Sequence, residues 1–165
     1  MKARCACVGA ILFAVAPSFA ADALFAELEE VYLTVLADSV SVHDAPDRVY
    51  AVAMGESRGK YIPVPEAMWT KLAARLKAKK VDPSQLVSPT DVEWKDGQRE
   101  SLIHKTTGKQ AWVYSIDAIT WHGGTRLRVA QSLCHGALAA GGYTLILEKK
   151  DGTWVIVQRI NPWAS

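Results

Sequence analysis

The sequence predicts an α+β fold in which two N-terminal helices pack on a curved antiparallel sheet, a meander of about five to six strands. Three observations support this prediction. Two segments with apolar residues at helical spacing lie in the first half of the chain, and segments of alternating apolar and polar residues fill the second half. Glycine-containing turns separate these later segments at short intervals. Because turns this short join only antiparallel neighbours, we expect an antiparallel sheet.

The first helix is expected over residues 22–38. Asp22 is a suitable N-cap, and four apolar side chains recur at helical spacing after it, namely Leu24, Leu28, Val31 and Val35. The segment RVYAVAMG (48–55) follows and predicts a strand that ends at Gly55. Together these segments predict a helix that packs its apolar face against the sheet.

A second helix is expected to begin near Pro65, because proline is well tolerated in the first helical turn. Met68, Leu72 and Leu76 form its apolar face. Lysines and arginines occupy the remaining positions, and we interpret them as a solvated surface. Residues 82–91 (DPSQLVSPTD) read as an irregular connection.

Five further strands are expected, over residues 99–106, 110–121, 126–134, 143–150 and 153–160. Leu127, Val129 and Leu133 alternate with polar residues, as in a strand with one solvated face. The turns between these segments contain glycine, at Asp96-Gly97, Thr107-Gly108-Lys109, His122-Gly123-Gly124 and Asp151-Gly152. The strand count and the turn lengths together predict the meander.

The N-terminus has the pattern of a secretory signal peptide. Lys2 and Arg4 precede an apolar run over residues 5–16, and Ser18 and Ala20 provide the small residues of a cleavage site. The run is shorter than the roughly 20 residues that a membrane-spanning helix needs, so we expect no stable membrane insertion. The sequence predicts cleavage after Ala20 and a single domain over residues 21–165, exported to the periplasm or the extracellular space.

Removal of Lys2 and Arg4 leaves 17 basic residues against 17 acidic residues. A chain without excess charge offers no electrostatic argument for nucleic acid as a partner. Cleavage would also remove two of the three cysteines and leave Cys134 alone, so no intramolecular disulfide is expected.

The segment CHGALAAGGYT (134–144) places Cys134 beside His135, a pair that suggests a nucleophile and its base. Adjacent side chains on a strand point to opposite faces, so His135 is not expected to activate Cys134. The glycines do not form a phosphate-binding loop, because the required lysine is absent. We interpret the segment as a connection of small residues, in which Gly136, Gly141 and Gly142 allow a bend or a close approach of two strands.

The C-terminal segments TTGKQAWVYSIDAITW, GALAAGGYTLILEKKDGTWVIV and PWAS resemble a group of uncharacterised short exported bacterial proteins. The order of helices and strands is similar to the cone-shaped layout of nuclear transport factor 2-like and cystatin-like domains. Enzymes of that superfamily place an acid or a histidine inside the cone. The resemblance therefore implies His104, Asp117 and His135 as candidate catalytic groups.

Cys134 is a further catalytic candidate, with a buried structural thiol as the alternative. Six tryptophans are a high number for this length, and Trp112, Tyr114 and Trp121 are candidate ligand-binding residues, with core packing as the alternative. No metal site or cofactor is expected, because the spacing of the histidines matches no metal-binding motif. His43 and Asp44, with Asp47 nearby, have a spacing that turns also use.

The sequence favours a small exported binding module that recognises a protein or a small-molecule ligand, for example an inhibitor or immunity-type protein. The first alternative is a small cone-fold enzyme that uses acid–base chemistry as an isomerase, dehydratase or hydrolase. The second is an envelope-assembly or structural factor. The sequence identifies neither the partner nor the oligomeric state.

Overall fold

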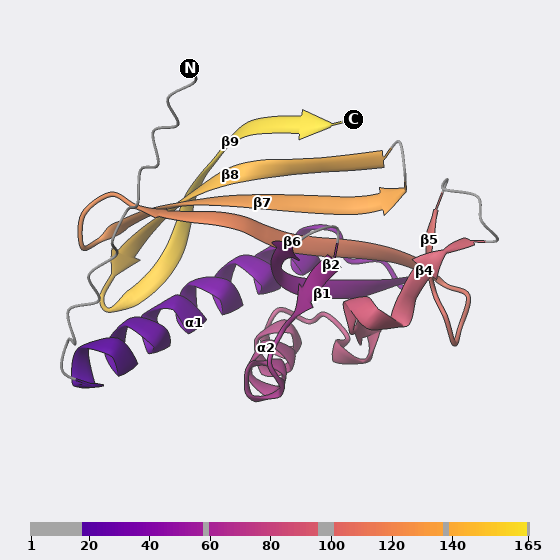
Figure 1. Ribbon diagram of the computed structural model, residues 1–165, viewed down its shortest axis with the longest axis horizontal. Coiled ribbons are helices and arrows are strands. Elements are labelled where there is room, and N and C mark those ends of the chain that lie inside the picture. Colours follow the sequence, from indigo (N-terminus) through magenta and orange to yellow (C-terminus); the bar gives the residue numbers. More distant parts are fainter. Residues whose placement is uncertain (1–17, 58–59, 96–100, 137–138, 165) are drawn as a thin grey trace, which may run out of the picture.

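The computed structural model describes residues 18–57, 60–95, 101–136 and 139–164 (Figure 1). Most of the predicted signal peptide and the predicted Asp96-Gly97 turn lie outside these ranges. The described chain combines helices and strands in an α+β structure, and its elements follow in order. They are α1 (Ser18–Val42), β1 (Arg48–Ser57), β2 (Lys60–Pro63), α2 (Glu66–Ala78), β3 (Leu86–Val87), β4 (Val92–Trp94), β5 (Leu102–His104), β6 (Gln110–Trp121), β7 (Arg126–Gly136), β8 (Ala139–Lys150) and β9 (Thr153–Ala164).

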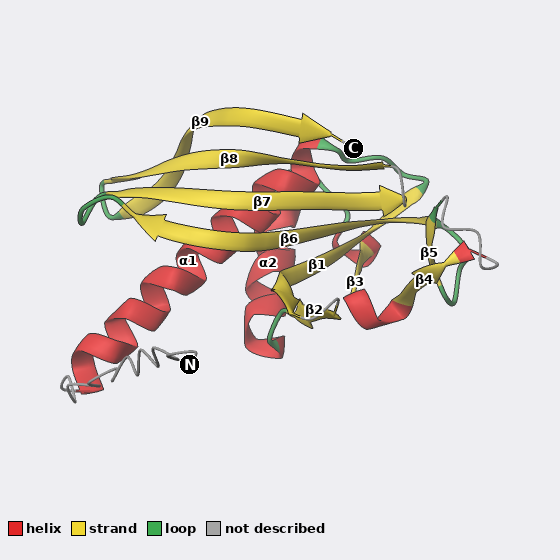
Figure 2. Ribbon diagram, turned by 45° about the horizontal axis from the view of Figure 1, so that its top comes forward, coloured by secondary structure: helices red, strands yellow, loops and turns green. Residues whose placement is uncertain are grey.

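The nine described strands form one mixed sheet. Its main path runs in the order β2-β1-β6-β7-β8-β9, while β3 pairs with β1, and β4 and β5 extend from β6. β1 runs parallel to both β6 and β3. From β6 to β9 the strands are antiparallel and long, and they run side by side across Figure 2.

The prediction of a wholly antiparallel meander of five to six strands is therefore wrong. The argument from short turns holds for the strands after residue 110, where hairpins join neighbours. It fails for β1, because the segment between β1 and β6 contains α2 and is long enough for β6 to run in the same direction as β1. Parallel pairing of β1 with β6 follows from that crossover.

The strand count was also too low, because three short strands carry little periodicity. β2 has four residues, and β3 and β4 have two and three. β3 lies in the segment expected to be an irregular connection, between two 3₁₀ turns at Pro83–Gln85 and Pro89–Asp91. Alternation over two to four residues does not distinguish a strand from a loop.

The segment from Cys134 to Tyr143, expected to connect two strands, belongs mostly to the strands themselves. β7 continues to Gly136 and β8 begins at Ala139, so only residues 137–138 separate them. Alanine and glycine have weak strand preference, which is why the sequence pattern missed these extensions.

Both helices pack on one face of the sheet, which we call the helix-facing side (Figure 2). The apolar face predicted for α2 is buried there, at Met68, Leu72 and Leu76. α1 contributes buried residues such as Val35 and Val40, and it extends four residues beyond the predicted end at 38. A smaller apolar cluster, which includes Ala51 and Val113, lies on the opposite face. Within the described residues, no helix has the length and apolar character that a membrane crossing requires.

Candidate functional site

A cavity of about 270 Å³ lies on the helix-facing side of the sheet, beside the C-terminal end of α1. We call it the histidine pocket. Its larger lining side chains are His43, Gln131, Leu133, His135, Tyr143 and Trp163, and the small residues Ala139 to Gly142 form the remaining wall. A second cavity of about 50 Å³ adjoins it and shares His43, Gln131 and Tyr143. The volume suits a single-ring molecule better than a larger compound.

Four side chains form a stacked cluster beside this pocket. The ring of Trp112 lies 4.7 Å from that of His135, nearly parallel to it, and 5.4 Å from that of His43. The guanidinium carbon of Arg48 lies 4.2 Å from the centre of the Trp112 ring, a cation–π contact. β6 carries Trp112 and lies between the strands that carry Arg48 and His135. Strand order therefore assembles the cluster from residues distant in sequence.

His43 is held at the end of α1 by its backbone surroundings. Its Nδ1 lies 3.1 Å from the carbonyl oxygen of Ser39. Because a carbonyl oxygen only accepts hydrogen bonds, Nδ1 donates to it, and Nε2 is the ring nitrogen left to interact with the pocket. The hydroxyl of Tyr50 donates to the carbonyl of His43 at 2.9 Å and fixes the adjoining loop.

His135 lies at a β-bulge, where the β7–β8 register shifts between Cys134 and Gly136. A bulge changes the direction of a side chain and is common beside functional sites. Burial lowers the pKa of His135, and the positive charges of Arg48 and His43 lower it further. The imidazole is therefore neutral at pH 7 and can accept a proton or a hydrogen bond through one ring nitrogen.

Three buried donors in or beside this cluster have no hydrogen-bond partner among the described residues. They are Nε of Arg48, Nε1 of Trp112 and the hydroxyl of Tyr114. The Tyr114 side chain is fully buried, and its ring lies 5.9 Å from that of His43. An unpaired buried donor costs about 1–3 kcal/mol, so most folded chains avoid such groups. Three of the four such atoms in the described chain lie here, which marks the cluster as a functional candidate.

Glycines on β8 let Trp163 form one wall of the pocket. A Cβ at Gly142 would contact the carbonyl oxygen of Gln131 and would lie 2.7 Å from Nε1 of Trp163. A Cβ at Gly141 would lie 2.9 Å from the carbonyl oxygen of Trp163. The close approach expected for Gly141 and Gly142 is confirmed, and it has a functional consequence, because both glycines line the cavity.

Cys134 and His135 lie on opposite faces of the sheet, as strand geometry predicts. Cys134 is half-buried in the apolar cluster on the opposite face, and its thiol lies 3.7 Å from the carbonyl oxygen of Gly136. Tyr61 packs against the same cluster. Burial raises the pKa of Tyr61, and the neighbouring Cys134 raises it further. The two neighbours in sequence therefore do not form a nucleophile–base pair.

Asp117 is also on the opposite face, and it is exposed. Its carboxylate accepts hydrogen bonds from the hydroxyls of Ser115 and Ser132. It occupies a bulge in β6, where the pairing with β7 shifts between Ile116 and Ala118. The structure therefore separates Asp117 from both histidines of the pocket.

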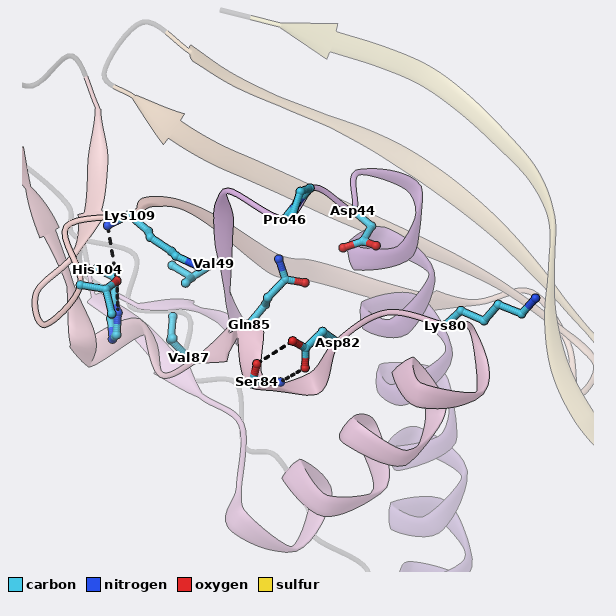
Figure 3. A pocket seen from close by; sticks show the side chains of 11 residues that line it. Asp44, Pro46, Val49, Lys80, Asp82, Ser84, Gln85, Val87, His104 and Lys109 are labelled. Carbon is cyan, nitrogen blue, oxygen red and sulfur yellow. Dashed lines mark hydrogen bonds between the residues drawn. The ribbon is translucent and has the colours of Figure 1, made fainter.

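His104 lies in a different groove of about 330 Å³ (Figure 3). Two polar side chains of this groove already have partners in local turns. Nδ1 of His104 lies 2.9 Å from the Thr107 hydroxyl, and the Asp82 carboxylate accepts hydrogen bonds from the backbone N–H and the hydroxyl of Ser84. Lys80 and Lys109 lie at opposite ends of the groove in Figure 3. These groups do not converge on a common point, so we do not assign this groove as the site.

A hollow of about 390 Å³ lies between α1, α2 and β9, and two of the charged side chains that line it are paired. Asp38, which lines it, accepts from Arg159 at 2.5 Å, and Arg75 donates to Glu30 at 2.5 Å. Trp154 also lines this hollow, and Trp121 packs edge-on against it at 5.8 Å. Trp121 therefore lies outside the histidine pocket.

Of the predicted site residues, the structure brings together His135, Trp112 and Tyr114. The other four lie elsewhere in the fold: His104, Asp117, Cys134 and Trp121. Sequence reasoning missed Arg48, Gln131, Tyr143 and Trp163, and it considered His43 only as a metal ligand. Gln131 and His135 are separated by an even number of positions on β7, so both side chains lie on the same face of the sheet. This spacing is the feature of the sequence that could have linked Gln131 to the site. The position of His43 depends on where α1 ends, which the sequence pattern placed too early.

Comparison of the chain with protein-family models, curated protein sequences and solved structures finds no match. Among the described residues, no group of three or more histidine, cysteine or acidic side chains is placed to hold a metal ion. The geometry of the histidine pocket is therefore the basis for a functional proposal.

Proposed function

We propose that the chain is an exported protein that binds a small, flat, mainly apolar molecule in the histidine pocket. The observation that carries this proposal is the pocket itself, which has two imidazoles and two aromatic side chains in its lining and a stacked cluster directly behind it. Export rests on the N-terminal pattern of Lys2, Arg4, the apolar run and the small residues before position 21.

The pocket walls support a ring-shaped ligand. Tyr143 and Trp163 contribute aromatic surface, and the Gly141-Gly142 backbone leaves room beside them. The imidazoles of His43 and His135 supply the few polar groups that orient a ligand in such a site. Both histidines are held in place, one by the Ser39 carbonyl and one by stacking on Trp112.

Titration of the protein with indole and with benzamide, followed by NMR shifts of backbone amides, tests this function. We expect saturable shifts centred on His135, Gly141 and Trp163. The Trp163→Ala variant should lose them, whereas Trp121→Ala should retain them, because Trp121 is also partly exposed but packs beside Trp154. Shifts centred on the His104 groove, or the absence of saturable shifts, would refute the proposal.

Acid–base catalysis is the second candidate, and the hydrogen bond that orients His43 favours it. Nδ1 of this ring donates to the Ser39 carbonyl, so Nε2 is the nitrogen beside the cavity at which a proton can be exchanged. The low pKa of His135 also keeps that imidazole available as a base at pH 7.

Exchange of the methyl protons of acetophenone in D₂O, measured by NMR, tests for a base in this pocket. Acceleration by the wild-type protein that is lost in His43→Gln would support catalysis. A rate no higher than that of buffer with an equal concentration of imidazole would exclude it for this class of substrate.

A further inference from the structure

The charges around the histidine pocket indicate the class of ligand. Its described lining contains two imidazoles and no carboxylate. Arg48 adds a permanent positive charge behind this lining: its guanidinium lies on the Trp112 ring, and that ring stacks on His135. The pocket therefore combines aromatic walls and two imidazoles with one permanent positive charge close behind His135.

The nearest carboxylates do not cancel this field. Asp38 lines the small adjoining cavity but is paired with Arg159 at 2.5 Å. Asp44 is exposed in the loop after His43. Asp47 lies 3.9 Å from Nε of Arg48, and its side chain is 76% exposed, so water screens its charge.

We propose that the ligand of the histidine pocket is a small aromatic carboxylate, with its ring against Trp163 and Tyr143 and its carboxylate toward His135. This inference rests on the proposed binding function and narrows its ligand class. The carboxylate provides an acceptor for the ring N–H of His135, and charge-assisted hydrogen bonds of this kind are about twice as strong as neutral ones. The positive field of Arg48 favours the anion over a neutral amide of the same shape.

Binding is coupled to protonation. In the free protein, burial and the positive neighbours hold the pKa of His135 below its ordinary value of 6.5. A bound carboxylate opposes both positive neighbours and raises that pKa, so binding takes up a proton. Affinity therefore increases as the pH falls from 8 toward 6. The charged groups that act on His135 are Arg48 on β1 and His43 in the loop before it. The other charged groups on the neighbouring elements are Asp44 and Asp47 in the same loop, and the paired Asp38 and Arg159 on α1 and β9.

Parallel titrations of the full chain with benzoate and benzamide at pH 6 and pH 8 test the inference, because the two probes share one shape and differ in charge. We expect benzoate to bind about tenfold more tightly than benzamide at pH 6, a change of about 1.4 kcal/mol. The ratio should be smaller at pH 8. Shifts of His135 and Trp163 should identify the site.

Two variants examine the role of charge. Arg48→Met keeps the apolar stem and should reduce the preference for benzoate, while Arg48→Lys should retain most of it. If Arg48→Met does not fold, His135→Gln serves instead, because it should abolish most of the pH dependence without removing Arg48. Retention of the full benzoate preference in Arg48→Met, or of the full pH dependence in His135→Gln, overturns the inference.

The outcomes separate the inference from the function on which it rests. Equal binding of benzoate and benzamide at the pocket rejects the carboxylate and retains the binding function. Binding of neither probe rejects both. Benzoate binding that maps to Lys80 and Lys109 rejects the assignment to the histidine pocket, because those lysines line the separate groove of Figure 3.

Discussion

Trp154 and Trp163 provide a paired test of which tryptophan stabilises the fold and which binds ligand. Trp154 is 2% exposed and belongs to the main core cluster, whereas Trp163 is 48% exposed and lines the histidine pocket. Truncation of a buried tryptophan to alanine costs about 3–5 kcal/mol. We expect Trp154→Ala to lose stability and Trp163→Ala to lose ligand binding.

The magnitude for Trp154 follows from its surroundings. Its Nε1 is buried without a partner, so the substitution also removes an unsatisfied donor that costs about 1–3 kcal/mol. That relief offsets part of the packing loss and places the net effect near the lower end, at about 3 kcal/mol. Trp154→Phe keeps most of the packing and removes the same donor, so it should cost about half as much or less.

Urea unfolding monitored by circular dichroism measures these differences, with thermal melting as a second readout. A loss of about 3 kcal/mol corresponds to a decrease in Tm of about 6–12 °C at this size. Trp163→Ala should lose less than about 1.5 kcal/mol, because half of its surface is already exposed. A Trp154→Ala variant that melts within about 2 °C of wild type, by the same scaling, would refute the assignment of this ring to the core.

Three other substitutions follow from the structure. Gly152→Val should destabilise the β8–β9 hairpin by about 1–2 kcal/mol in urea unfolding, because Gly152 has φ of +80°, and Gly124→Ala is the control in open space. Gly142→Ala should displace the Trp163 indole and abolish the benzoate-induced NMR shifts; unchanged shifts would show that the wall is not held by contact. The lowered pKa of His135 means that the unfolded chain binds a proton more readily, so its stabilising contribution is present above about pH 6.5 and declines as the pH falls toward the folded pKa. When the pH falls from 7 to 5.5, the free energy of unfolding should therefore decrease less for His135→Gln than for wild type, as measured by urea unfolding. An identical pH profile for the two proteins would contradict the lowered pKa of His135.

Periodicity located the long elements but not their pairing. The apolar positions of α2 and the bounds of the strand at 110–121 match the structure, because both depend on repeats that span many residues. The parallel pairing of β1 with β6 depends on contacts between residues some 60 positions apart, such as Tyr50 opposite Trp112. No local pattern encodes that pairing.

The same pairing explains why the candidate site was only partly visible in the sequence. His135 and Trp112 were recognised as chemically interesting, but Arg48 reads as an ordinary residue at the start of a strand. It enters the cluster because β1 lies beside β6 and places its guanidinium over Trp112. A purely antiparallel meander gives no reason to place the first strand beside the strand of Trp112, so the error in topology concealed the contribution of Arg48.

The small residues of CHGALAAGGYT have one physical effect that links fold and function. Side chains of ordinary size on β8 would fill the space beside His135, and a Cβ at Gly142 alone would contact both Gln131 and Trp163. Ala139 to Gly142 therefore leave a cavity in a position where the rest of the sheet is packed. Because glycine weakens a strand, this segment trades local strand stability for space. The loss of strand stability is easier to explain if a ligand occupies this cavity than if the segment serves the fold alone.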